Sequence, residues 1–188
     1  FVELIDASIS ILRGRGMRVY PDFPTGGIAD FSQYNDGQRG GKIKVRARIE
    51  QVDAKLLKIT EVPFATTTSS LIDSIIRANE KGKIKIKKIE DNTAEFVEIL
   101  IHLPPGVSPD KTIDALYAFS DCEISISPNA CIIKNDKPYF MSVSDILKQS
   151  TAHTLDLLKA ELEILLSEQQ ALWHFASLER IFIENKIY

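Results

Sequence analysis

Positive charge recurs at every second residue along one short stretch of the chain. In the run RGGKIKVRARIE, Arg39–Glu50, lysines and arginines alternate with apolar residues. Successive side chains of a strand point to opposite faces, so the pattern predicts a strand with one apolar and one cationic face. We expect the apolar face to pack on the core through Ile43, Val45, Ala47 and Ile49. The cationic face would carry Lys42, Lys44, Arg46 and Arg48, a row of charges suited to a phosphate backbone.

The same pattern has a simpler interpretation. Lysine-rich strands also occur at solvated sheet edges, where charge resists aggregation, and this strand alone leaves both readings open. Arg39, in the Gly-Gln-Arg-Gly-Gly turn, adds a fifth cation on a backbone that can approach a phosphate closely. A second basic cluster comprises Lys83, Lys85, Lys87 and Lys88. This cluster also has two interpretations, a phosphate-binding surface or a solvated strand edge.

Residues for catalysis or metal binding are sparse. The three histidines lie far apart and have no cysteine or carboxylate companion: His102, His153 and His174. Tyr20 and Tyr34 are near basic loops, but neither has arginine neighbours placed to activate a nucleophile. Cys122 and Cys131 form no CxxC pair, so we expect buried, reduced thiols, no metal site and no self-sufficient active site. The loop around Arg39 also lacks the Gly-Lys-Ser/Thr of a nucleotide-binding loop.

Composition indicates an ordinary intracellular protein. The chain has 188 residues, 44% hydrophobic and 26% charged, and a formal net charge of −3. The charge is segregated, because Arg39 to Lys88 holds 13 basic and 5 acidic residues, a balance of +8, and the stretch that follows is mainly acidic. A local positive field is therefore expected in an acidic protein. No apolar run approaches the ~20 residues of a membrane span, which predicts a cytoplasmic protein without a membrane partner.

Hydrophobic periodicity and turn residues predict alternating strands and helices. The expected helices are Val2–Leu12, Leu71–Asn79 with a cap at Ser69 or Ser70, and one opened by Ser108-Pro109. The expected strands are Lys42–Glu50 and Lys55–Val62, forming a hairpin about Asp53, then Ile84–Ile89 and Glu95–His102, then Cys122–Ser127 and Ala130–Lys134. This order favours an α+β fold, a two-layer sandwich with a mainly antiparallel sheet and helices on one face.

The last quarter of the chain differs from the rest in composition and in the spacing of its apolar residues. From Ser144 to Ile187 there is no proline or glycine and apolar residues recur at helical spacing, which predicts one helix of ~40 residues, ~60 Å long. A helix of that length needs a partner helix. We therefore expect three segments: an N-terminal helix and linker at 1–16, an α+β domain at 17–143, and a coiled-coil helix at 144–188. The missing initiator methionine suggests a piece of a longer protein.

Several motifs together resemble a known family. They are Pro21-Asp22-Phe23-Pro24-Thr25-Gly26-Gly27, then Gly37-Gln38-Arg39-Gly40-Gly41-Lys42 with the ladder ending at Arg48, then Glu61-Val62-Pro63-Phe64, and then Asn135-Asp136-Lys137-Pro138. In this order they are similar to the A subunit of bacterial type IIA DNA topoisomerases, gyrase and topoisomerase IV. The resemblance covers nearly the whole chain and implies a tower domain with the start of the coiled-coil arm. It leaves gyrase and topoisomerase IV as alternatives.

The resemblance implies a function for the cationic strand. Members of that family break one duplex, pass another through it and reseal it, with ATP and Mg²⁺ handled by a B subunit in an A2B2 assembly on nucleoid DNA. The attacking tyrosine would precede this chain, so the piece alone would be inactive and would bind and bend the gate duplex without sequence specificity. The DNA-contact residues it implies are Arg39, Lys42, Lys44, Arg46, Arg48, Thr25 and Gly26. An independent nucleic-acid-binding module and a scaffold domain are the alternatives.

Two stretches depart from the family pattern. An isoleucine that wedges between base pairs usually stands just before the Pro-Asp-Phe-Pro motif of that family, whereas this chain has Met17-Arg18-Val19-Tyr20 before Pro21. Three alternatives follow: Val19 takes that role, a residue elsewhere takes it, or the wedge is absent. The segment from Ile28 to Asp36 is shorter than in typical gyrases, which puts the small helix expected there in doubt.

Overall fold

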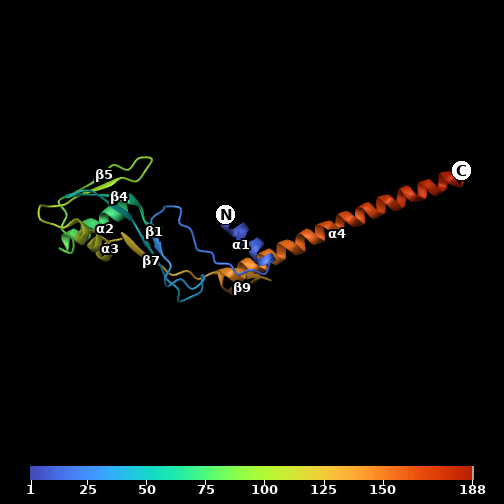
Figure 1. The fold of residues 1–188 in the computed structure, drawn as a ribbon, viewed down its shortest axis with the longest axis horizontal. Helices are drawn as coiled ribbons and strands as arrows, with labels where there is room; N and C mark the ends of the chain where they lie inside the picture. Colours follow the sequence, from blue (N-terminus) through green and yellow to red (C-terminus); the bar gives the residue numbers. More distant parts are fainter. Residues whose placement is uncertain (188) are drawn as a thin grey trace. The chain divides into compact units, whose positions relative to one another are not determined.

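The computed structural model describes residues 1–187 and divides them into two compact units. One unit is Tyr20–Ser142; the other combines Phe1–Val19 with the chain from Val143 onward. The sequence predicted three segments with boundaries after residues 16 and 143. The N-terminal helix α1 (Val2–Leu12) and the last helix α4 (Val143–Glu184) share one unit (Figure 1).

Three antiparallel sheets build the unit from Tyr20 to Ser142. The first has the order β1-β2-β7 and comprises β1 (Ile28–Asp30), β2 (Ile43–Arg46) and β7 (Glu123–Ile126). The second has the order β3-β4-β6-β5 and comprises β3 (Arg48–Asp53), β4 (Leu56–Glu61), β6 (Ile99–His102) and β5 (Lys88–Asp91). The third is the hairpin of β8 (Cys131–Lys134) and β9 (Lys137–Phe140). The predicted hairpin about Asp53 is confirmed by the β3–β4 pairing.

Two helices, α2 (Thr68–Glu80) and α3 (Pro109–Phe119), pack beside the four-stranded sheet (Figure 1). The core residues between these layers are fully buried: Leu57, Ile59, Ile99 and Ile101 from the sheet, Leu71 and Ile75 from α2, and Leu116 from α3. The α+β fold class predicted from the element order is confirmed. Ser108 is the N-cap of α3 with Pro109 in the first turn, also as predicted.

Local details of two elements differ from the sequence predictions. Helix α2 begins three residues earlier than expected, because Thr67 is its N-cap and forms a capping box with Ser70. The predicted strand from Ile84 is shifted to β5, since Asn79 Oδ1 accepts the Ile86 N–H and diverts that segment into a loop. Cys131 was expected to be buried but is exposed; only Cys122 is buried.

The cationic stretch is not one strand, which corrects the central sequence prediction. The chain breaks at Ala47, so Ile43–Arg46 belongs to the first sheet and Arg48–Asp53 to the second. The cause is Ala47 itself, which is fully buried, donates its N–H to Cys122 O and accepts the Tyr117 hydroxyl at its carbonyl. Its backbone groups are thus paired across the boundary between the two sheets rather than in either ladder.

The unit containing both chain ends is built on the long helix. Helix α4 has 42 residues, close to the length predicted, and α1 packs against its first turns, where Ala7 and Thr151 are buried. Beyond that contact its apolar residues are exposed, including Leu155, Leu158, Leu162 and Leu165 at three- and four-residue spacing. No helix in residues 1–187 is long and apolar enough to cross a membrane.

Candidate nucleic-acid interface

The alternation of inward and outward residues along β2 is as the sequence predicted. Ile43, Val45 and Ala47 are at most 1% exposed, whereas Lys42, Arg46 and Arg48 are exposed and Lys44 is half-buried. We call the four cations Lys42, Lys44, Arg46 and Arg48 the ribbon. The ribbon crosses the sheet boundary, so its last member belongs to β3 and not to β2.

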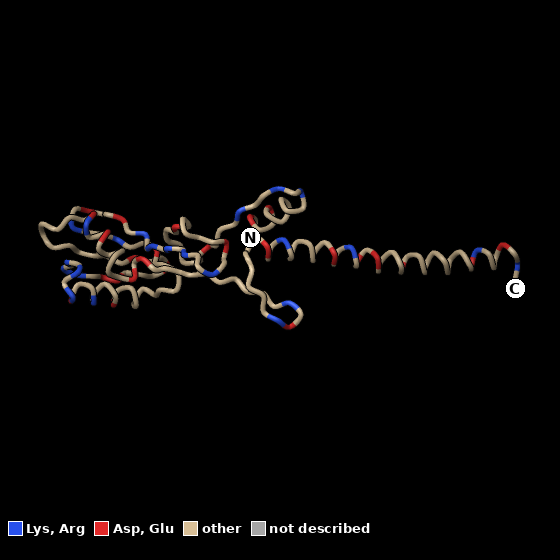
Figure 2. Tube along the Cα trace, turned by 90° about the horizontal axis from the view of Figure 1, so that it is seen from below, with Lys and Arg blue, Asp and Glu red and all other residues tan. Residues whose placement is uncertain are grey.

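The ribbon is not unbrokenly cationic. Lys44 Nζ lies 3.3 Å and Arg46 Nε 2.5 Å from the two carboxylate oxygens of Glu123, which stands opposite Arg46 on β7. Arg48 Nε lies 3.1 Å from Glu61 Oε1 on the neighbouring β4. In Figure 2, acidic positions (red) are interspersed with basic positions (blue) in the part of the trace on the left of the view. The sequence could not reveal these acids, since Glu123 is 77 residues from Arg46.

Glu123 and Glu61 are held ionised by their partners. Burial raises the pKa of Glu123, but hydrogen bonds from Arg46 and Lys44 outweigh it, so the pKa is below its usual value. The pKa of Glu61 is lowered first by the N–H of Gly27 and then by Arg48. Conversely, the hydrogen bond to Glu123 raises the pKa of Arg46. Both acids are charged at neutral pH and orient the guanidinium groups that they neutralise.

Glu61 also joins the Pro21–Gly27 loop to the ribbon. Its Oε2 accepts the Gly27 N–H while its Oε1 accepts Arg48, so one carboxylate binds both segments. The loop packs too closely for side chains at two positions. A Cβ on Gly26 would lie 2.8 Å from Glu61 Oε2, and one on Gly27 2.6 Å from the Arg46 carbonyl oxygen. Both glycines have positive φ, +77° and +93°. Thr25 and Gly26 are exposed and directly precede Gly27, which lies against the Arg46 carbonyl and is bonded to Glu61.

The Glu61-Val62-Pro63-Phe64 turn holds the same loop by an aromatic contact. The rings of Phe23 and Phe64 lie 5.4 Å apart between centroids. The loop is thus fixed at two points, a carboxylate and an aromatic pair. Two motifs that are more than thirty residues apart in the sequence form one structural feature.

Lys42 of the ribbon and Arg39 of the preceding turn lie at the end where β2 begins. Arg39 and Lys42 are exposed, and within residues 1–187 the ribbon's ion pairs involve only Lys44, Arg46 and Arg48. The Lys42 N–H donates to Gln33 O, and a Cβ on Gly41 would lie 2.7 Å from the Asn35 nitrogen, so the Arg39 turn is packed on the segment before it. Arg39 and Lys42 are therefore more available to an incoming anion than Lys44, Arg46 and Arg48.

Tyr117 was missed by sequence reasoning. It donates to Ala47 O at 2.9 Å, and the Arg46 guanidinium lies 5.0 Å from its ring centroid. Burial is the main cause that raises its pKa, so the hydroxyl is protonated and serves to fix Ala47 and Arg46. Tyr20, one of the two tyrosines singled out from the sequence, packs on Phe31 and Tyr34.

No cluster for metal binding is formed by the residues described. Within residues 1–187 no three His, Cys, Asp or Glu side chains are grouped to hold an ion. Burial raises the pKa of Cys122 to about 11, which keeps this thiol protonated. In the second basic cluster Lys88 pairs with Glu90, and Lys83 lies over the Phe119 ring at 5.6 Å.

Comparison with known proteins assigns the family. The family model for the A subunit of DNA gyrase/topoisomerase IV matches residues 1–187. The chain belongs to this family. It is 44% identical over 183 residues to the DNA topoisomerase 4 A subunit of Borreliella burgdorferi, covering 97% of this chain and 29% of that protein. It is 29% identical to the DNA gyrase A subunit of Lawsonia intracellularis, covering 90% of this chain and 21% of that protein. It is 30% identical to the DNA topoisomerase 4 A subunit of Staphylococcus epidermidis, covering 73% of this chain and 18% of that protein.

The family resemblance read from the sequence motifs is thereby confirmed. The chain spans less than a third of the length of these relatives. The contact residues named from the sequence, Arg39 to Arg48 with Thr25 and Gly26, lie on the loop and strand elements described above and stay predictions.

The two acids predict a specific pH dependence of stability. A carboxyl whose folded pKa is depressed adds stability above its unfolded pKa, near 4.3, and loses it as the pH falls through the folded value. Between about pH 6 and about pH 3 the melting temperature of the wild type should therefore fall more steeply than that of the double variant E61Q/E123Q. Calorimetric melting across that range tests this; parallel curves would mean that the partners of the two carboxylates in the folded chain do not stabilise their ionised forms.

Proposed function

We propose that this chain is the duplex-binding part of the DNA breakage-reunion subunit of an ATP-dependent type IIA topoisomerase. It binds the gate duplex along the ribbon and the Thr25-Gly26 loop, in the bacterial cytoplasm on nucleoid DNA. The observation that carries this is the junction of two sequence motifs on one surface: exposed cations Arg39 and Lys42 at one end, Arg46 and Arg48 beside the glycine loop at the other. The family membership supplies the context.

The proposed contacts are to backbone phosphates, and the ribbon has the chemistry for that. Lysine and arginine contacts to phosphate position a duplex but do not read its sequence. Bending a short duplex costs on the order of 1–6 kcal/mol, which additional phosphate contacts must offset. A ribbon held in fixed geometry by Glu61 and Glu123 supplies such contacts without ordering its side chains anew on binding. Binding without sequence preference, accompanied by bending, is the expected behaviour.

We assign cleavage and resealing of the DNA to other parts of the proposed assembly. We place the attacking tyrosine in a part of the protein other than this chain, and ATP and Mg²⁺ on a partner B subunit in an A2B2 complex. Tyr117 is not placed for that role, because its hydroxyl is engaged with a backbone carbonyl and its pKa is raised rather than lowered. The chain alone should bind DNA without cleaving it.

Binding and bending of labelled duplexes test the function. The 188-residue chain is titrated onto a ~30-base-pair duplex carrying a fluorophore at each end, over a range of salt concentrations and with several unrelated sequences. We expect sequence-independent affinity that falls steeply with salt and a rise in energy transfer between the ends on binding. A chain that binds no duplex at low salt would refute the function, and binding without a rise in transfer would refute the bending.

Removing an acid from the ribbon should strengthen binding. E123Q leaves Lys44 and Arg46 without their neutralising partner, so we expect DNA affinity to rise roughly two- to tenfold at about 0.1 M salt. E95Q, the same change in an exposed loop residue, serves as the control. A lower affinity for E123Q than for E95Q would mean that Glu123 acts chiefly by positioning the two cations.

A role in assembly is the second candidate, and the long helix favours it. The exposed apolar residues of α4 recur at three- and four-residue spacing over much of its length, and no lysine, arginine, aspartate or glutamate stands between Glu168 and Glu179 (Figure 2). Such a surface is that of a coiled-coil helix lacking its partner. We propose that it pairs with another helix of the intact protein, forming the coiled-coil arm.

A further inference from the structure

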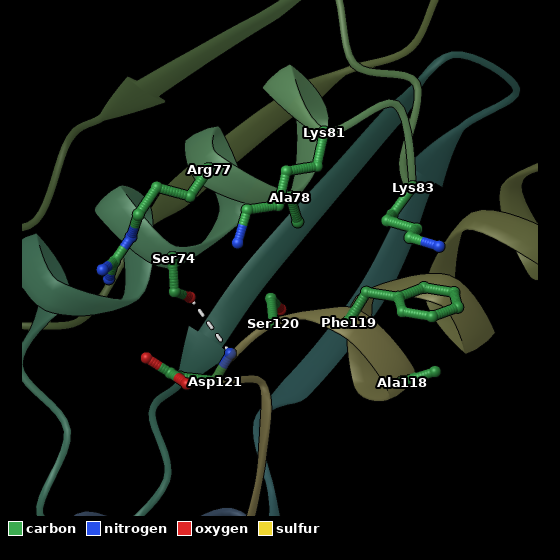
Figure 3. A pocket seen from close by; sticks show the side chains of 9 residues that line it. All are labelled: Ser74, Arg77, Ala78, Lys81, Lys83, Ala118, Phe119, Ser120 and Asp121. Carbon is green, nitrogen blue, oxygen red and sulfur yellow. Dashed lines mark hydrogen bonds between the residues drawn. The ribbon is translucent and has the colours of Figure 1, made fainter.

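A second concentration of positive charge lies in a groove between α2 and the end of α3. The groove has a volume of about 580 Å³ and lies between Ser74, Arg77 and Lys81 on α2, Lys83 on the loop after it, and the segment Ala118–Asp121 (Figure 3). Residues 74, 77, 78 and 81 occupy one side of α2 because they are three and four apart. The cations Arg77, Lys81 and Lys83 thus line a single opening.

These three cations differ from Lys44, Arg46 and Arg48 of the ribbon in having no acidic partner. The ion pairs of residues 1–187 include none with Arg77, Lys81 or Lys83, and all three are exposed. Arg77 Nε donates to the Asp73 carbonyl, and Lys83 lies over the Phe119 ring. No ion pair therefore neutralises them within the part of the chain that the structure describes.

The walls of the groove are fixed to one another. The buried hydroxyl of Ser74 donates to Leu71 O and accepts the Asp121 N–H at 3.0 Å, which joins α2 to the segment after α3 (Figure 3). The Ser120 hydroxyl donates to Leu116 O and accepts the Cys122 N–H. Both hydroxyls are used to hold the fold, so the groove is formed before any ligand arrives.

The charge balance indicates the class of anion. Asp121 offsets one of the three cations, and the carbonyl ends of α2 and α3, which both lie at the groove, contribute about half a negative charge each. The remaining excess of roughly one positive charge matches a singly charged phosphodiester better than a doubly charged phosphomonoester.

Residues of the groove are close neighbours in the chain of residues that contact the ribbon. Asp121 precedes Glu123 by two residues, about 7 Å along an extended chain, and Glu123 stands opposite Arg46. Tyr117, which precedes Phe119 of the groove by two residues, contacts Arg46 of the ribbon. A duplex that lies on the ribbon has further phosphates beyond it, because the ~13 Å of β2 spans less than half of a ~34 Å helical turn.

From these observations we propose that the Arg77-Lys81-Lys83 groove is a second binding site for the phosphodiester backbone of the same DNA duplex. The proposal rests on the proposed function, since it assigns an additional contact to the duplex bound by the ribbon. Asp121 then limits the affinity of the groove, as Glu123 limits that of the ribbon.

A charge-matched pair of triple variants tests the site. R77Q/K81Q/K83Q removes the groove cations, and K55Q/K111Q/K137Q removes three exposed lysines of the same unit. Binding to a ~30-base-pair duplex is measured across a salt series, with circular dichroism to check folding. For the groove variant we expect the slope of log K against log salt to flatten by about 1–2.7, up to ~0.9 for each lost contact. Equal slopes for the two triple variants would overturn the proposal.

A substitution of opposite sign separates binding from a structural role. D121N leaves the backbone N–H that Ser74 accepts in place and removes the acid, so duplex affinity should rise about two- to fivefold. Unchanged or weaker binding by D121N would contradict the site. A further experiment titrates the wild type and the groove variant with inorganic phosphate. If the groove variant no longer binds phosphate but its salt slope for DNA is unchanged, the ligand of the groove is a small anion and not the duplex.

The outcomes distinguish this proposal from the proposed function. If the wild type binds no duplex, the function itself fails. If the wild type binds and the ribbon variants weaken binding while the groove variants do not, the function stands and the groove assignment is wrong.

Discussion

Duplex DNA will bind the variant K42A/K44A/R46A/R48A on the order of a hundredfold or more weakly than the wild type at about 0.1 M salt. Each phosphate contact that is lost removes ~0.9 from the slope of log K against log salt, so four contacts flatten it by up to ~3.6. The structure adds a second cause. Removing the cations leaves Glu61 and Glu123 uncompensated on the same surface, where they repel the phosphates. A salt series with a ~30-base-pair duplex gives both quantities.

The control removes the same number of positive charges elsewhere. K55A/K111A/K134A/K137A changes four exposed lysines of the Tyr20–Ser142 unit, so it reproduces the loss of net charge without touching the ribbon. We expect its slope to change by less than a quarter as much. Equal losses of duplex affinity in the two variants would show that binding responds to net charge alone. The duplex would then not be bound specifically at β2. Calorimetric melting of both variants verifies that they fold.

The sequence predicted the period of the ribbon but not its break. Alternation along Ile43 to Ala47 identified the buried face correctly because strand period is a local property. The break at Ala47 depends on Cys122 and Tyr117, residues some seventy positions away that meet it only in the folded chain. The carboxylate partners were hidden for the same reason. Local patterns specify which side chains share a face, whereas their neutralisation depends on non-local pairing.

The same distinction explains the other elements. The length of α4 and the cap of α3 were predicted because helix periodicity and a Ser-Pro start are local signals. The segment from Ile84 to Lys87 has the alternation of a strand but is not one, since Asn79 captures the Ile86 N–H. The Pro21–Gly27 loop was singled out by its residues, but its attachment to Glu61 and Phe64 was not evident. That attachment is the most sensitive point of the site.

Alanine at Gly27 is expected to destabilise the Tyr20–Ser142 unit far more than alanine at Gly40. The two glycines have nearly the same φ, +93° and +92°, so both substitutions carry a conformational cost of roughly 1 kcal/mol or more. At Gly40 a Cβ meets nothing within 4 Å, whereas at Gly27 it lies 2.6 Å from the Arg46 carbonyl oxygen. The loop must then move away from β2, and the hydrogen bond from the Gly27 N–H to Glu61 is lost.

The difference between the two variants isolates that close approach. We expect G27A to lose about 2–3 kcal/mol more than G40A, a further 5–10 °C in Tm, measured by differential scanning calorimetry. Because the loop that carries Thr25 and Gly26 then moves away from the ribbon, duplex affinity should fall in G27A and remain near the wild-type value in G40A. Equal melting temperatures would mean that the loop moves away without cost, and Glu61 would then not be what holds Thr25 and Gly26 beside the ribbon.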